Sequence, residues 1–190
     1  MATDKNSTQQ AHELTIGMFG TLEEVREMAK IEHEVQSYDE ARNMLIKLIK
    51  KPLINRTGLE VTLSKKSIDK ILSGKALGKS FDMRAHFFAA ANLKKLFFNA
   101  IEPFKFPLIP GKHNENYLEV KRLYSPMSYD IRIIPIKFTV IEMLNPKEGK
   151  RLYSVEAIDV DLGKNRGYLE GIPKMKVQVS WPRVCPAALR

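Results

Sequence analysis

The chain contains 190 residues, which is enough for one ordinary domain with an appendage around a single hydrophobic core. Its formal net charge is +9, and its 44% hydrophobic content is typical of a soluble globular protein. No apolar run approaches the roughly 18 residues of a membrane-spanning helix. The N-terminus lacks the basic start and apolar core of a signal peptide. A single cysteine, Cys185, excludes a fold that depends on internal disulfides, so we expect folding in the cytoplasm.

The positive charge is concentrated in one part of the chain. Residues 1–57 carry 8 Lys and Arg against 9 Asp and Glu, whereas residues 58–190 carry 23 against 13. A compact basic region indicates a polyanionic partner such as RNA, DNA or an acidic protein. A surface that is basic only for solubility is the alternative. We therefore divide the chain into a polar tail with a helical extension, residues 1–57, and a basic domain, residues 58–190.

The N-terminal part is predicted to be a tail followed by two helices. Residues 1–13 are polar, and their composition predicts disorder. Thr21 and Ser37 are each followed three positions later by a glutamate, which is the signature of a capping box. These two boxes predict helices over residues 21–35 and 38–51.

The basic part is predicted to begin with a strand and two helices. Residues 59–63 alternate between apolar and polar side chains, as in a short strand. Ser64 can cap a helix that ends at Gly74, and a basic loop follows up to residue 80. Residues 84–101 form the most apolar segment of the chain and predict one buried helix.

Strands are predicted for the remainder of the chain. Three segments rich in β-branched and aromatic residues, 117–124, 131–144 and 151–160, predict three strands. The turn-forming segment 145–149 joins the second to the third as a hairpin, and residues 174–181 predict a last short strand. Helices followed by an antiparallel sheet predict an α+β fold with an N-terminal helical extension.

Three stretches, taken in order, resemble a known group of nucleases. They are the strand-to-helix segment Val61–Ile68, the apolar segment Ala85–Ala100, and the set formed by Tyr117, Lys121–Tyr124, Ile136–Glu142 and Lys150–Glu156. Together they resemble the barnase, EndoU, colicin and RelE-like nuclease domains of phage head-associated and large polyvalent phage or mobile-element proteins. The resemblance covers about residues 58–160. It implies helices packed on a curved antiparallel sheet that carries the active site on its concave face.

The resemblance also implies a toxin-type, metal-independent ribonuclease. Such an enzyme directs the ribose 2′-hydroxyl at its own phosphate and releases a cyclic phosphate. The reaction needs a base, an acid and cations around the phosphate. Histidine titrates near neutral pH, which makes His86 the candidate for proton transfer. The alternative is a partly buried His86 that is hydrogen-bonded locally.

The other candidate catalytic residues lie on successive predicted strands. Arg122 and Lys137 are candidates for binding the scissile phosphate, and Tyr153 is a candidate acid or stacking platform. An exposed sheet face explains Lys137 equally well, and the edge of the core explains Tyr153. The strand register is open at this stage, and Ser154 and Glu156 take the place of Tyr153 if the register is inverted.

Further basic residues are candidates for nucleic-acid binding: Lys65, Lys66, Lys79, Arg84, Lys150 and Arg151. The alternative for each is a solvated surface charge. The four histidines and one cysteine are scattered, with no spacing that suits zinc, so we expect no metal and no cofactor.

Two main functional hypotheses follow. The first is the ribonuclease, with RNA as substrate and an acidic immunity protein or inhibitor as partner. The second is a non-catalytic module on the same fold that docks to nucleic acid or to a phage or secretion-system protein, with the N-terminal helices as docking device. A DNA-directed enzyme is a weaker third possibility. Either main hypothesis allows a cytoplasmic protein or one delivered into a target cell as part of a larger phage or toxin system.

Overall fold

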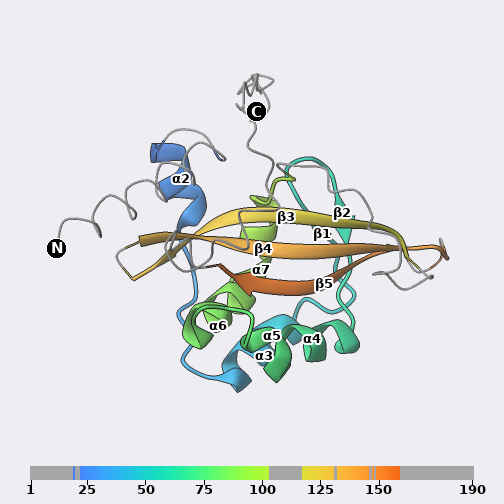
Figure 1. Cartoon of the computed structure of the whole chain (residues 1–190), viewed down its shortest axis with the longest axis horizontal. Helices are drawn as coiled ribbons and strands as arrows, with labels where there is room; N and C mark the ends of the chain where they lie inside the picture. The colour runs from blue at the N-terminus through green and yellow to red at the C-terminus, as the bar shows by residue number, and fades with distance from the viewer. Residues whose placement is uncertain are drawn as a thin grey trace.

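The structure is a computed structural model that describes residues 19, 22–102, 117–130, 132–145, 147 and 149–158. The predicted tail over residues 1–13 and the predicted strand over residues 174–181 lie outside this part of the chain. Helices surround a three-stranded antiparallel sheet, and a two-stranded hairpin lies beside it (Figure 1). The predicted α+β class with N-terminal helices is therefore confirmed.

The elements follow one another in this order: α2 (Leu22–Ala29), α3 (Tyr38–Ile46), β1 (Leu53–Ile54), β2 (Glu60–Val61), α4 (Lys65–Ile71), α5 (Gly74–Leu77), α6 (Met83–Ala91), α7 (Leu93–Phe98), β3 (Tyr117–Tyr129), β4 (Arg132–Met143) and β5 (Lys150–Ala157). The large sheet has the strand order β3-β4-β5, and the small sheet pairs β1 with β2. In Figure 1, α3, α4, α5 and α6 gather on the β5 side of the large sheet, and α2 lies beside β3.

The hydrophobic core lies between the helices and one face of the large sheet. Leu123, Phe138 and Val155 are paired across β3, β4 and β5, and each is almost completely buried. The ring of Phe97 on α7 meets the ring of Phe138 edge to face, with centroids 5.8 Å apart. Because side chains alternate along a strand, the neighbouring positions of the same strands point to the opposite face.

The predicted buried helix over residues 84–101 is wrong, because the segment forms two helices that break at Asn92. The side-chain amide of Asn92 donates to the carbonyl oxygens of Phe88, at 2.8 Å, and of His33, at 2.7 Å. Its oxygen accepts from the backbone N–H groups of Glu32 and His33. These contacts anchor the chain between α2 and α3 at the point where α6 ends, so a tertiary contact interrupts a segment that is locally helical.

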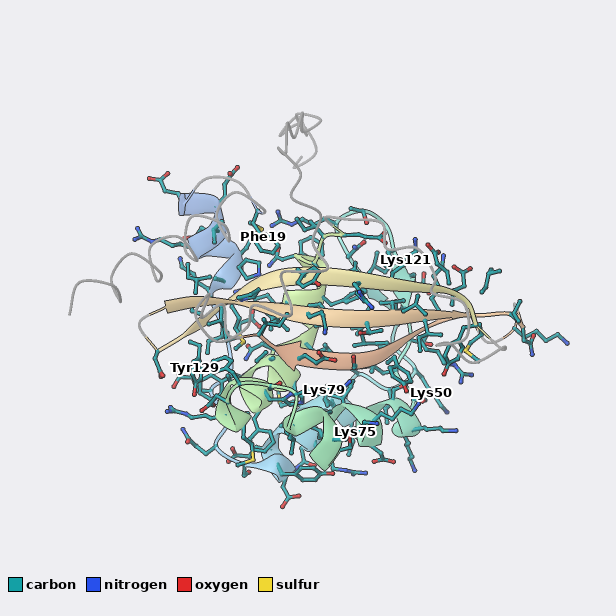
Figure 2. The ribbon with its side chains drawn as sticks, viewed as in Figure 1. Phe19, Lys50, Lys75, Lys79, Lys121 and Tyr129 are labelled. Carbon is teal, nitrogen blue, oxygen red and sulfur yellow. The ribbon has the colours of Figure 1, made fainter. Side chains whose placement is uncertain are left out.

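The start of α6 is tied to the sheet by a carboxylate and a tyrosine. Asp82 caps the helix by accepting from the Ala85 N–H at 2.8 Å, and it also accepts from the Tyr129 hydroxyl at 2.7 Å. Burial and the bond to Asp82 raise the pKa of Tyr129 to about 12. In Figure 2, Tyr129 lies beside α6 at one end of the sheet. This contact positions α6 at the sheet end where the β3–β4 connection lies.

The N-terminal extension contributes to the same core as the basic part. Ala41 and Leu45 on α3 are fully buried within the main hydrophobic cluster, and α3 packs against α6. The hairpin of β1 and β2 pairs Leu53 with Val61. The expected boundary between residues 57 and 58 therefore falls inside this hairpin, although a division into two folding units stays a prediction.

We predict that Leu45→Ala lowers the free energy of unfolding of the whole chain by about 2–5 kcal/mol, because it opens a cavity in the shared core. Urea unfolding followed by circular dichroism measures the change. Ile46→Ala is the control. Because the Ile46 side chain is 42% exposed, its truncation should lower the free energy of unfolding much less. A separate early transition that only Leu45→Ala shifts would show instead that the extension unfolds on its own.

Candidate functional site

His86 on α6 has no exposed surface, and protein groups bind both of its ring nitrogens. Nε2 lies 2.9 Å from the carbonyl oxygen of Ile71, which can only accept, so Nε2 carries the proton. Nδ1 therefore accepts from the Ser80 hydroxyl at 2.8 Å. The Ser80 oxygen in turn accepts from the Ala157 N–H at 2.9 Å. This chain of hydrogen bonds joins α4, α6 and the end of β5.

The environment of His86 favours the neutral imidazole. Burial lowers its pKa below the ordinary value of 6.5, while the bond to Ile71 and the charge of Glu156 act in the opposite direction. Proton transfer to a substrate would require one of the two present partners to leave. The geometry therefore gives His86 a structural use, and its catalytic role stays a prediction.

The structure settles the strand register that the sequence left open. Lys137 pairs with Glu156, and the neighbouring Thr139 pairs with Arg122 on one side and Ser154 on the other. Arg122 and Lys137 thus share the sheet face opposite the core, and Ser154 and Glu156 belong to that face. This is the alternative register considered from the sequence.

A buried ion pair forms the centre of this face. The side chains of Lys137 and Glu156 are in direct salt-bridge contact, and each is 7% exposed. Lys79, after α5, approaches the same carboxylate at 3.6 Å, and the Ser154 hydroxyl donates to it at 3.4 Å. We call these four residues the Glu156 cluster. Because buried charges are stable only when paired, the carboxylate and the Lys137 ammonium neutralise each other, and the predicted phosphate role of Lys137 stays untested.

Tyr153 precedes Ser154 of the Glu156 cluster, but its ring contacts a different residue. The register shifts between Thr139 and Val140, so Tyr153 falls at a bulge in β5. Its side chain is 37% exposed, and the ammonium of Lys70 on α4 sits 3.9 Å from the centre of its ring. Of the four predicted catalytic residues, Arg122 and Lys137 share a sheet face, His86 is bonded to Ser80 and Ile71, and Tyr153 meets Lys70.

A basic surface covers α4, α5 and the turn after them. It consists of five exposed lysines, which we call the lysine surface: Lys65, Lys66, Lys70, Lys75 and Lys79. Figure 2 shows Lys75 and Lys79 on the same side of the molecule, next to β5. The one acidic residue of residues 64–80, Asp69, is bound to Arg42 at 3.0 Å. Among the described residues, no carboxylate is within salt-bridge distance of Lys65, Lys66 or Lys75.

The start of β5 adds further cations next to this surface. The Thr62 N–H donates to the Lys150 carbonyl at 3.0 Å, and the Leu152 N–H donates to Thr62 at 3.3 Å. Lys150 and Arg151 therefore lie beside the segment that leads into α4. Arg84, the remaining candidate, is exposed at the start of α6, where its guanidinium lies 5.1 Å from the centre of the Phe88 ring.

The described part of the chain contains no group of three or more His, Cys, Asp or Glu side chains that could hold a metal ion. No described helix is long and apolar enough to cross a membrane.

Comparison with known proteins gives one match. The family described as large polyvalent protein-associated domain 3 matches residues 32–153, which extend from the segment before α3 into β5. No curated protein and no solved structure matches the chain.

We predict that His86 makes the protein less stable in mild acid. Its folded pKa is depressed, so its contribution is present above pH 6.5 and is lost as the pH falls through the folded value. Urea unfolding of wild type and His86→Gln between about pH 7.5 and 5.5 measures this. Wild type should lose more stability over that range, although the variant is about 1–3 kcal/mol less stable at pH 7.5 because the substitution disturbs the two hydrogen bonds of the buried imidazole. Equal pH dependence in both proteins would contradict the neutral assignment.

Proposed function

The chain belongs to the large polyvalent protein-associated domain 3 family, and on this premise we propose that it is a non-catalytic module that binds nucleic acid. The observation that carries the proposal is the lysine surface. It presents five exposed ammonium groups on one short segment, and Asp69, its one acidic residue, is held by Arg42. Clustered cations of this kind bind the phosphate backbone and release its counterions, whatever the base sequence.

The contacts of β5 support a longer binding track. Thr62 holds the start of β5 beside α4, so the backbone segments of Lys150 and Arg151 are neighbours of the lysine surface. The Lys150 ammonium lies 3.6 Å from the Glu142 carboxylate. Both side chains are partly exposed, so a phosphate can replace Glu142 as the partner of Lys150 at little cost. Cations spread over two elements suit an extended polyanion better than a compact anion.

The ribonuclease inferred from the resemblance is the second candidate, and the Glu156 cluster is the observation that favours it. A carboxylate between two lysines, on the same face as Arg122, has the groups that phosphate chemistry uses. Two features count against it. His86 has no unbound ring nitrogen, and Glu156 already neutralises Lys137.

The proposal also places this domain within a larger phage system, with other proteins as partners. The family name refers to large polyvalent proteins, which fits a domain that acts within a larger phage system, either inside the cell or delivered to a target cell. An acidic immunity protein would compete with nucleic acid for the lysine surface. A phage or secretion-machinery protein would instead contact the N-terminal helices.

We predict salt-dependent binding that depends on the lysine surface. Fluorescence anisotropy with labelled oligonucleotides, between about 50 and 300 mM salt, measures Kd and its salt slope. The double variant Lys66→Glu with Lys75→Glu should lower the slope by about 1.4–1.8, because each of the two lost phosphate contacts contributes roughly 0.7–0.9. The control, Lys30→Glu with Lys94→Glu, changes net charge equally at exposed sites on other elements.

Two results would contradict this proposal. An equal loss of affinity and of salt slope in the two double variants would mean that net charge, and not the lysine surface, determines binding. No binding of folded wild type to any RNA or DNA, single-stranded or duplex, would remove nucleic acid as the partner. An acidic protein would then be the partner to seek.

We also predict that folded wild type leaves mixed RNA uncut in excess EDTA, because His86 and Lys137 are already bound within the protein. Gel analysis and mass spectrometry of the RNA ends measure this. Arg122→Ala and Lys79→Ala are the matched variants. Cleavage to a cyclic phosphate by wild type, lost in both variants, would replace the binding module with the ribonuclease.

A further inference from the structure

Tyr153 has an unusual position in β5. Its neighbours Leu152 and Ser154 pair with Val140 and Thr139, which are consecutive in β4, so Tyr153 has no partner in the ladder. An extra residue at a bulge turns its side chain away from the regular alternation of the strand. Leu152 is fully buried and Ser154 nearly so, whereas Tyr153 is 37% exposed. The bulge therefore directs an aromatic ring to the surface.

The exposed ring lies against the lysine surface. The Lys70 ammonium is 3.9 Å from the ring centre, which is a cation–π contact between two exposed side chains. Such a contact is weak where water reaches it, and the lysine stem is flexible. Lys70 can therefore move from the ring to a phosphate without breaking a buried interaction.

Two further cations belong to the elements that carry this contact. Lys66 is one helical turn before Lys70 on α4, so the two lysines share a helix face. Arg151 precedes Tyr153 by two residues on β5, and the bridge to Thr62 holds that part of β5 close to the start of α4. An aromatic ring within a track of cations is the arrangement that binds single strands, because bases stack on the ring while phosphates meet the cations.

We propose that the module binds single-stranded nucleic acid and that Tyr153 stacks on an unpaired base, while Lys70 transfers from the ring to the adjacent phosphate. The inference rests on the proposed function, since it names the ligand class of the same surface. A duplex offers phosphates to the lysines but no base to Tyr153, because its bases are already stacked within the double helix. The ring contacts the base and not the sugar, so RNA and DNA strands should both bind.

The test compares single-stranded RNA, single-stranded DNA and a duplex of the same sequence by fluorescence anisotropy. Tyr153→Leu should weaken binding of both single strands about 5- to 150-fold, with an unchanged salt slope and an unchanged duplex affinity. Tyr153→Phe, which keeps the ring, should bind like wild type. Phe98→Leu is the matched control, because Phe98 is 50% exposed beneath Arg56 but lies on α7.

The outcomes separate this inference from the proposed function. If single strands and duplex bind equally and Tyr153→Leu weakens neither, the lysine surface binds nucleic acid but the stacking site is wrong. If Tyr153→Leu weakened binding of only RNA or only DNA single strands, base stacking would also be overturned. If no nucleic acid binds, both proposals fail. Photocrosslinking of a 5-iodouracil oligonucleotide gives an independent measure, and we expect the crosslink at Tyr153 in wild type.

Discussion

The outer edge of β5 is the constraint on which the rest of the structure depends. β5 is the last strand of the large sheet, so one row of its N–H and C=O groups has no strand partner and needs other bonds. Thr62 bonds to its first residues, and Ser80 and Phe81 bond to Ala157 at its end. The segment from Thr62 to Phe81 is thus held to β5 at both ends, and it carries α4, α5 and the lysine surface. The contacts that complete the sheet therefore also position the basic surface beside Tyr153.

The buried polar groups next to this edge reinforce it. A neutral His86 can accept from Ser80 while donating to Ile71, whereas a protonated ring could not accept at all. Ser80 then donates its hydroxyl proton to Nδ1 and accepts from the N–H of Ala157. The adjacent Glu156 cluster pairs opposite charges where water has little access. His86 and Lys137, which the sequence offers as catalytic candidates, therefore also make contacts that join separate elements, and their catalytic roles stay predictions.

Two surfaces with different chemistry result, and Lys79 belongs to both. On the sheet face that Arg122 shares, the charge of Glu156 is paired with Lys137 and approached by Lys79. The surface of α4 and α5 contains lysines whose charges are largely unmatched, with an aromatic ring at its border. Unmatched cations attract an external polyanion, while matched charges mainly stabilise the fold. This difference is why we propose a binding module and place the hydrolytic enzyme second.

The sequence alone determined the features that depend on near neighbours. The capping box of Ser37 with Glu40 and the cap of Ser64 are present as predicted, and the three main strands lie within a few residues of their expected limits. The α+β class and the basic character of residues 58–190 also follow from local pattern and composition. Such features depend on side chains within about one turn of helix or along one strand, so a single segment contains all the information.

Only the tertiary structure decided the features that depend on distant partners. Asn92 breaks the predicted long helix because its amide binds the backbone near His33, which lies 59 residues away. The bulge at Tyr153 and the side of the sheet taken by Glu156 depend on how β5 pairs with β4. The hydrogen bonds of His86 to Ser80 and Ile71 exist only because the fold brings these three residues together. A segment cannot specify these contacts by itself, since each requires two parts of the chain to be brought together by the core.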